Sequence, residues 1–218
     1  MKKTYQQFCC SIGCLVAFAL WTLLLRWVDV QPIGPRGTCV GFATINGFVH
    51  RLTGVWMPIY TITDWLGLVP VAIGCGFAVL GLLQWMQRKN ILKVDWDILM
   101  LGVFYLLMLA VYLLFESVVI NYRPVLIDGY LEVSYPSSTT LLVLCVMPTT
   151  LWQVRRRVGR PLLCRVFMAI IILFMVFMVG GRLLAGVHWL TDIIGGGLLA
   201  AGMVTLYTAV CRLKEGVS

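Results

Sequence analysis

The sequence predicts an all-α, polytopic membrane protein with six transmembrane helices. Of its 218 residues, 61% are hydrophobic and only 12% are charged, and the mean hydropathy is +0.94. A soluble domain typically has about 45–50% apolar and about 25% charged residues. Six apolar stretches approach or reach the roughly 20 residues that a membrane-spanning helix needs. Little chain remains outside them, so we expect one membrane-embedded domain over residues 1–218.

The predicted spans cover residues 8–27, 66–86, 97–117, 137–153, 164–182 and 190–210. The first resembles a secretory signal, but no small-residue cleavage site follows it, so we expect an uncleaved helix. Residues 38–63, between the first two spans, are too polar to cross. Apolar residues recur there at helical spacing: Phe42, Ile45, Val49 and Leu52. This pattern predicts an outward-facing interfacial helix.

The basic residues predict the orientation of the chain. Six crossings put both termini on one side of the membrane. If that side is the cytoplasm, twelve of the 17 Lys and Arg residues are cytoplasmic and five are outside, which agrees with the positive-inside rule. We expect a plasma-membrane protein with both termini in the cytoplasm. The net charge of +8 then needs no nucleic-acid partner.

Several reactive residue types receive structural interpretations. The eight cysteines are scattered without the spacing of metal ligands, so we predict no metal and no cofactor. His50 lies beside Arg51 on the expected interfacial helix and is interpreted as a polar-face residue. Gly195, Gly196 and Gly197 lie inside an apolar span, where small residues allow close helix packing.

Three polar segments fall on the outward side of this topology. The first is residues 116–124, after the third span, and the second is residues 135–140, where Pro136 and hydroxyl residues open the fourth. The third runs from Gly180 to Asp192 around the fifth loop. Polar groups at a membrane edge are costly enough to suggest function.

The residue types in these segments suit phosphoryl transfer. His188 and Asp192 are four residues apart on one helical face, so the carboxylate can orient the imidazole and stabilise its protonated form. Arg123 and Arg182 offer planar donors that match phosphate oxygens. The start of the fourth span adds free backbone N–H groups. The structural alternative is that Arg182 pairs with Asp192 while His188 caps the helix.

Residues 116–197 resemble the type-2 phosphatidic acid phosphatase superfamily, with the six-span layout of its bacterial integral-membrane branch. That family carries Lys-x6-Arg-Pro, Pro-Ser-Gly-His and Ser-Arg-x5-His-x3-Asp. Here the third motif is present as Arg182, His188 and Asp192, the first keeps Arg123-Pro124, and the second keeps Pro136-Ser137.

The resemblance implies that His188 attacks phosphorus and that Asp192 orients it. It also implies that the phosphate is held by Arg123, Ser137 and Arg182, to which we add Ser138 and Thr139 from the second motif. No metal is implied. The expected substrate is a lipid phosphate or diphosphate in the bilayer.

Four motif positions depart from the family. Glu116 replaces Lys, Ser138 replaces Gly, Thr139 replaces the second His, and Gly181 replaces Ser. A threonine hydroxyl is too basic to act as the general acid near neutral pH. Glu116 would repel the substrate, pair with Arg123, or serve as the acid from a new position.

A diphosphate has a weakly basic leaving group and needs little protonation. The sequence therefore favours a polyprenyl diphosphate substrate, as in undecaprenyl diphosphatases, cleaved at the outer face. The alternatives are a lipid-phosphate-binding pseudoenzyme and a lipid phosphotransferase. A transporter is disfavoured because the predicted spans carry no charge at their centres.

Overall fold

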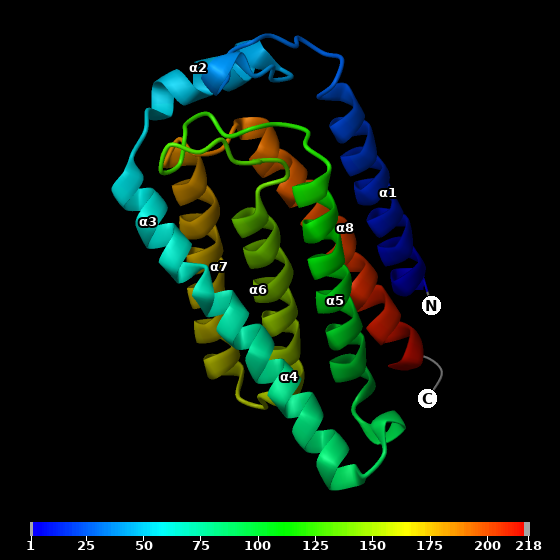
Figure 1. Ribbon diagram of the computed structural model, residues 1–218. Helices are drawn as coiled ribbons and strands as arrows, with labels where there is room; N and C mark the ends of the chain where they lie inside the picture. Colours follow the sequence, from blue (N-terminus) through cyan, green and yellow to red (C-terminus); the bar gives the residue numbers. More distant parts are fainter. Residues whose placement is uncertain (1, 216–218) are drawn as a thin grey trace.

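The computed structural model describes residues 2–215 as a bundle of helices (Figure 1). The order is α1 (Lys2–Leu24), α2 (Ala43–Thr53), α3 (Met57–Leu66), α4 (Leu68–Arg88), α5 (Trp96–Ser117), α6 (Ser138–Arg157), α7 (Pro161–Leu184) and α8 (Leu190–Glu215). Short 3-10 turns occur at Pro35–Gly37 and Ile91–Lys93. The all-α prediction is confirmed.

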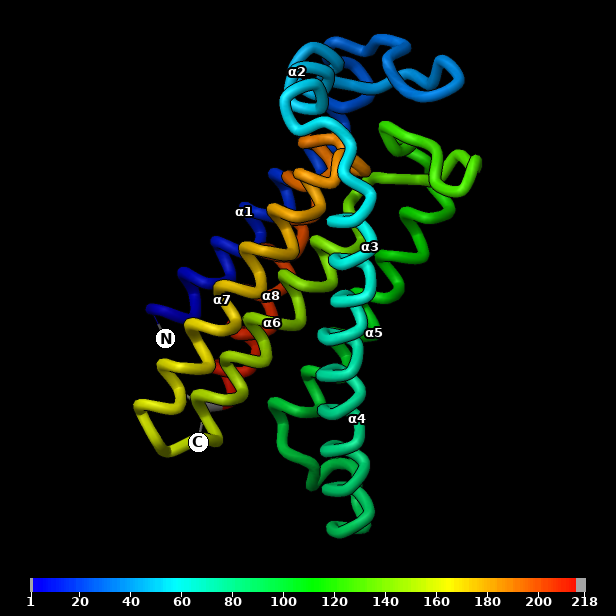
Figure 2. Tube along the Cα trace, turned by 90° about the vertical axis from the view of Figure 1, so that its left-hand side faces the viewer, coloured from blue at the N-terminus to red at the C-terminus, as the bar shows by residue number. Residues whose placement is uncertain are grey.

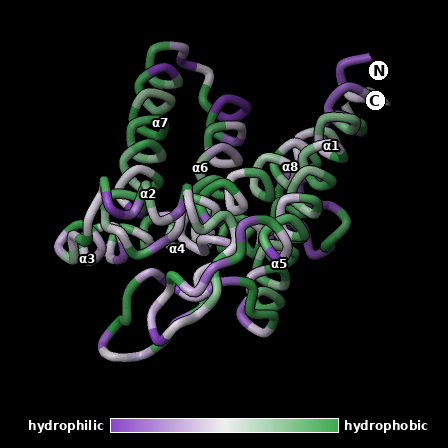
Figure 3. Tube along the Cα trace, turned by 90° about the horizontal axis from the view of Figure 1, so that it is seen from above, coloured by the Kyte–Doolittle hydropathy of each residue, from purple (hydrophilic) through white to green (hydrophobic). Residues whose placement is uncertain are grey.

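Five helical segments within residues 2–215 are long and apolar enough to cross a membrane: Lys2–Leu24, Met57–Arg88, Trp96–Ser117, Pro161–Leu184 and Leu190–Lys214. Hydrophobic residues run along α5 and α7, whereas hydrophilic residues gather mainly near helix ends and in loops (Figure 3). Helix α6 is not among these five segments: it carries several Ser and Thr residues, Pro148 and Gln153, and three arginines in its last turn. It nevertheless lies among the other long helices (Figures 1 and 2), so the count of six crossings stays a prediction.

The segment between the first two spans differs from the expectation. Helix α2 lies across one end of the bundle (Figure 1) and exposes Ile45, Phe48 and Leu52, as an interfacial helix would. Helix α3 was expected to be part of the same polar segment, which is wrong. It continues through Gly67 into α4, so the apolar helix begins at Met57 and has 32 residues.

The interior is built around α6 and α8. Side chains of both helices, including Leu141, Cys145, Leu199 and Met203, form the largest buried cluster with α1 and α5. Glycines allow the close approach of neighbouring segments. A Cβ atom at Gly195 would lie 2.5 Å from the Tyr135 ring, which confirms the packing interpretation for this position.

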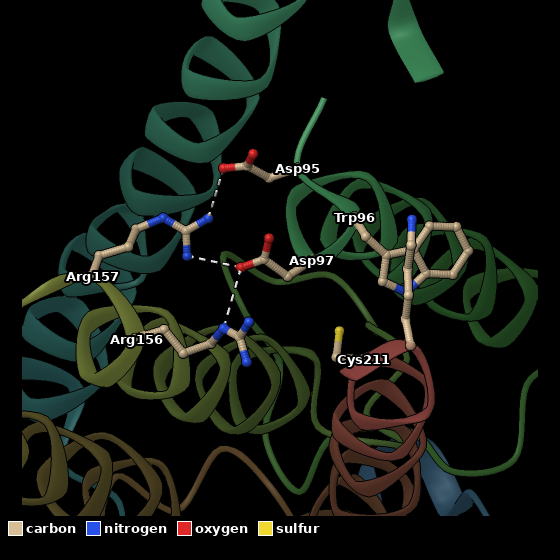
Figure 4. Close-up of a pocket in the computed structure, with 7 residues that line it drawn as sticks. Asp95, Trp96, Asp97, Arg156, Arg157 and Cys211 are labelled. Atoms are coloured by element: carbon tan, nitrogen blue, oxygen red, sulfur yellow. Dashed lines mark hydrogen bonds and ion pairs between the residues drawn. The ribbon is translucent and has the colours of Figure 1, made fainter. Parts of the chain in front are cut away.

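The end of the bundle that holds both termini carries a polar network (Figure 4). Asp97, at the start of α5, is buried and lies 2.8 Å from Arg157 Nη1 and 3.7 Å from Arg156 Nε, both at the end of α6. Asp95 pairs with Arg88 at 2.9 Å. Acidic side chains at a helix start and basic ones at a helix end also complement the helix dipoles. The network therefore ties α4, α5 and α6 together.

Candidate active site

The three polar segments meet at the other end of the bundle. Helices α5 and α7 end there, α6 and α8 begin there, and the loop of residues 118–137 closes over them (Figure 1). The loop is folded back on itself, because Tyr122 bridges Val133 and the Arg123 N–H donates to the Glu132 carbonyl at 2.9 Å. The backbone thus brings Arg123 to the start of α8.

Asp192 holds this region together through several hydrogen bonds. Its side chain is fully buried, and Oδ2 accepts a hydrogen bond from the Trp189 N–H at 2.9 Å. Oδ1 accepts one from Asn121 Nδ2 at 3.2 Å, and the backbone carbonyl accepts one from the Ser137 N–H at 3.1 Å. One residue therefore joins all three polar segments.

His188 faces this carboxylate. Its Nδ1 lies 3.6 Å from Asp192 Oδ2, an ion-pair distance slightly too long for a hydrogen bond, and its side chain is almost fully buried. The carboxylate position favours the tautomer with a proton on Nδ1. The Nε2 atom has no partner among the described residues, which leaves its lone pair available.

The electrostatic surroundings keep His188 neutral. Burial lowers the pKa of His188 to about 4, and the nearby charges of Arg123 and Arg182 add to that effect, although Asp192 opposes it. We expected Asp192 to stabilise the protonated form. Burial and the two arginines outweigh it and lower the pKa, which favours the neutral imidazole, the form that a nucleophile needs.

Arg123 and Arg182 lie around one aromatic ring. Their guanidinium carbons are 5.7 Å and 4.9 Å from the centre of Tyr60. Arg123 Nε lies 3.0 Å from Glu132 Oε2, and Arg182 Nη2 lies 3.4 Å from Asp64 Oδ1. The alternatives in which Arg182 pairs with Asp192, or Arg123 with Glu116, are therefore not observed in the described ion pairs.

Unpartnered polar atoms gather at this end. Nine buried side-chain atoms of residues 2–215 have no hydrogen-bond partner, and six of them belong to Arg123, Ser134, Arg182 and His188. Buried polar groups are usually satisfied. The Arg123 Nε atom is one of the six because its contact with Glu132 lacks hydrogen-bond alignment. The arginine donors and the histidine match what a phosphate would need.

The start of α6 adds further polar groups. Ser137 is fully buried, and its Oγ accepts a hydrogen bond from Thr140 Oγ1 at 3.0 Å, which leaves the Ser137 hydroxyl proton free to donate. Ser138 and Thr139 occupy the first turn of α6, where backbone N–H groups have no intrahelical acceptor. The positions of all three residues fit a phosphate-binding helix start.

Glu116 lies in the last turn of α5. It lines a small cavity of about 10 Å³ together with His188, Ser134 and Ser138. A cavity of this size holds about one water molecule. The Glu116 carboxyl group is therefore within the surroundings of the candidate nucleophile.

Several residues around the site did not emerge from the sequence. Tyr60, Thr63 and Asp64 come from α3, and Thr63 Oγ1 lies 3.5 Å from Arg182 Nη1. Asp64 was the one available signal, because it is a carboxylate within a long apolar helix. His50 also contributes, since its Nε2 lies 3.2 Å from the Gly186 carbonyl in the loop before His188.

Fold and site together describe a helical membrane protein in which a buried histidine and two arginines have unpartnered side-chain atoms at one end of the bundle. The sequence model of the PAP2 superfamily matches residues 99–214, more than half of the chain. The protein belongs to the PAP2 superfamily.

A comparison of structures gives a match over the whole fold. The crystal structure of a transmembrane PAP2 type phosphatidylglycerolphosphate phosphatase from Bacillus subtilis aligns with a TM-score of 0.61 and 17% identity. The alignment covers 96% of this chain and 98% of the other. No curated protein matches the sequence. The structural match establishes the shared transmembrane fold, including α1 to α4, which lie before the matched family region.

Proposed function

We propose that this protein hydrolyses a lipid diphosphate or lipid phosphate through a phosphohistidine on His188, at the outer face of the plasma membrane. The observation that carries the proposal is the set of unpartnered buried atoms on Arg123, Arg182 and His188. An anion placed among them would satisfy the arginine donors and meet the free histidine nitrogen. The excess of basic residues at the opposite end supports the outer location.

In the first step, the Nε2 lone pair of His188 attacks phosphorus. The P–N bond forms while the bond from phosphorus to the leaving oxygen breaks, and the leaving group departs with that electron pair. His188 gains positive charge, which Asp192 stabilises through Nδ1. Arg123 and Arg182 balance the charge on the phosphoryl oxygens.

In the second step, a water oxygen attacks phosphorus from the side that the leaving group has vacated. The P–N bond breaks, and its electron pair returns to Nε2. The water gives up a proton, and inorganic phosphate is released. Glu116 lines the cavity beside His188 and, unlike Asp64, Glu132 and Asp192, forms none of the described ion pairs, so it is our candidate acceptor for this proton.

The leaving group decides which substrates react well. A lipid alkoxide must be protonated as it leaves, and losing a general acid typically costs about 10²–10⁴ in rate. Thr139 cannot supply that acid. A lipid diphosphate releases a lipid monophosphate, which is far less basic. We therefore favour a polyprenyl diphosphate as substrate.

A groove on the membrane side of the protein supports the proposal that the substrate is a long-chain lipid. It has a volume of about 710 Å³ and is lined mainly by apolar residues of α4 and α5. Leu142 and Val146 of α6 also line it, about one and two turns from Ser138. A lipid chain in this groove would reach toward the start of α6.

Phosphate release by the detergent-purified protein tests the proposal. The substrates are a polyprenyl diphosphate, a polyprenyl monophosphate, phosphatidic acid and phosphatidylglycerol phosphate. The last is included because the structurally similar protein from Bacillus subtilis is a phosphatidylglycerolphosphate phosphatase. We expect release from the diphosphate to be fastest and to disappear with His188→Ala. Faster release from a monophosphate would contradict the substrate preference.

A lipid-phosphate-binding protein without turnover is the second candidate, favoured by Thr139 at the position of the family's second histidine. Binding without phosphate release from any of the four lipids would establish it. Loss of phosphate from the donor lipid that requires a second lipid, with the phosphate recovered on that second lipid and not as inorganic phosphate, would identify a phosphotransferase.

A further inference from the structure

The two arginines of the site share a single aromatic neighbour that belongs to no family motif. The guanidinium carbons of Arg182 and Arg123 lie 4.9 Å and 5.7 Å from the centre of the Tyr60 ring. Both distances are within the roughly 6 Å at which a cation is attracted to the face of an aromatic ring. Tyr60 is therefore in contact with both positive charges at once.

Two guanidinium groups around one buried site repel each other, and their carboxylate partners compensate only in part. The Arg182 side chain is 2% exposed, but its partner Asp64 is 59% exposed and 3.4 Å away. Glu132, the partner of Arg123, is 41% exposed. Because exposed ion pairs contribute little, the partly buried Tyr60 ring is the neighbour that both cations share.

The position of Tyr60 is itself fixed by packing. Its side chain contacts the buried cluster of Ile127, Ala185 and Val187. One turn earlier, the Trp56 N–H donates to the Ala185 carbonyl at 3.1 Å. The ring is therefore attached to the loop that carries His188.

Gly181 allows α3 to come this close to α7. A Cβ atom at position 181 would lie 2.7 Å from Thr63 Cγ2, closer than two carbon atoms can approach. The family's serine at this position would collide with Thr63. The absence of a side chain at Gly181, where the family has Ser, therefore lets α3 lie this close to the site.

We propose that Tyr60 is a positioning residue of the anion site, which holds Arg123 and Arg182 in the arrangement that receives the phosphate. The proposal rests on the proposed function, because it assumes that these arginines bind the phosphate of the substrate. The π-face of the ring carries this role, and the hydroxyl group does not. A phenylalanine at position 60 should therefore preserve this role, whereas an aliphatic residue should not.

The test compares Tyr60→Phe with Tyr60→Leu in the full-length protein. Binding of inorganic phosphate is measured by isothermal titration calorimetry in detergent, and phosphate release is measured from polyprenyl diphosphate. We expect Tyr60→Leu to weaken phosphate binding about 5- to 30-fold and to raise KM more than it lowers kcat. Tyr60→Phe stays within about twofold of the wild type.

Tyr130 provides the matched control, because it is a 73% exposed tyrosine of the same outer end. Tyr130→Leu leaves binding and turnover unchanged. Thermal unfolding of each variant establishes that the fold is intact, and Tyr60→Met replaces Tyr60→Leu if the latter does not fold. Unchanged phosphate binding in the aliphatic variant overturns the proposal, as does an equal loss in Tyr60→Phe.

The outcomes for Tyr60 and for the proposed function are separable. If the wild type releases no phosphate but binds inorganic phosphate in a manner that depends on the Tyr60 ring, the positioning role stands and hydrolysis is wrong. If His188→Ala abolishes release while Tyr60→Leu binds and reacts like the wild type, hydrolysis stands and the positioning role is wrong.

Discussion

The carboxylate of Asp192 lies 3.6 Å from His188 Nδ1 and is held there by hydrogen bonds from the Trp189 N–H and the Asn121 side chain. Asn121 belongs to the first polar segment, whereas Asp192 belongs to the third. The orientation of His188, the candidate nucleophile, therefore depends on Asn121, which lies 71 positions before Asp192.

This relationship predicts two graded losses of activity. Asp192→Asn should lower kcat on the order of 10⁴-fold, as for the orienting aspartate of a catalytic triad. Asn121→Ala removes one hydrogen bond to a charged group, worth about 1.5–3 kcal/mol, and should cost about 10- to 150-fold. Phosphate-release assays at saturating substrate check both values. Equal losses in the two variants would contradict a positioning role for Asn121.

The protonation of His188 predicts an unusual pH dependence. Because burial, Arg123 and Arg182 lower its pKa to about 4, the group stays neutral as the pH falls through 6.5 and becomes protonated only near 4. The acid limb of kcat/KM should lie near pH 4, since this ratio reports the free enzyme.

The chain contains two histidines, so ¹⁵N NMR of a His50→Gln variant isolates the His188 signal. We expect no titration of that signal between pH 8 and pH 5.5. A midpoint near 6.5 would show that the imidazole is solvated and would contradict this prediction.

The threonine of the second motif gives a prediction about leaving groups. If Thr139 does not transfer a proton, Thr139→Val removes at most one hydrogen bond and should lower kcat/KM by no more than about tenfold. The loss should be the same for a lipid diphosphate and a lipid monophosphate. A much larger loss on the monophosphate would assign proton transfer to this hydroxyl.

The apolar groove predicts a dependence on lipid chain length. A Cβ atom at Gly102 meets no neighbouring atom within 4 Å, and this residue lines the groove. Gly102→Phe should therefore fill the groove without a clash and should raise KM for a polyprenyl diphosphate. Turnover of a short-chain diphosphate should be unaffected.

Gly76 of α4 provides the comparison, because its Cβ position is equally open but it does not contribute to the groove. If Gly76→Phe has the same effect on the long-chain substrate as Gly102→Phe, the groove is not where the lipid chain lies.

The polar network at the end with the termini predicts a separation of stability from activity. Asp97→Asn weakens contacts with Arg156 and Arg157 and should destabilise the protein by about 1–3 kcal/mol, seen as a lower Tm in detergent. The value of kcat/KM below the new Tm should not change, because the site is at the opposite end (Figure 1). A change in KM would indicate that the two ends are coupled.

Local patterns in the sequence predicted the centre of the site. His188 and Asp192 are one helical turn apart, so their proximity follows from helix geometry. Arg182 lies on the preceding helix, and the predicted spans place it at the same membrane face. Family resemblance and membrane topology together were sufficient for these residues.

The contribution of α3 could not be predicted in the same way. Tyr60, Thr63 and Asp64 make residues 38–63 and their surroundings look too polar for a span, yet Asp64 is compensated by Arg182, which lies 118 positions later. The sequence shows that Asp64 is polar. It does not show that Arg182 will lie beside it, because that contact exists only in the folded protein. The family motif indicated Arg123 itself, but its contact with Tyr60 could not be predicted, because it joins two segments without a shared pattern.

The place of Arg182 along its helix has a consequence for how substrate arrives. It lies in the last turn of the 24-residue helix α7, which is about 36 Å long and so passes the roughly 30 Å hydrocarbon layer with little to spare. With α7 across the bilayer in the orientation that we propose, the guanidinium group would lie near the depth of the lipid phosphates. A lipid substrate would then meet it by lateral diffusion alone, without being lifted out of the bilayer, and the rate of encounter would follow the mole fraction of substrate in the membrane.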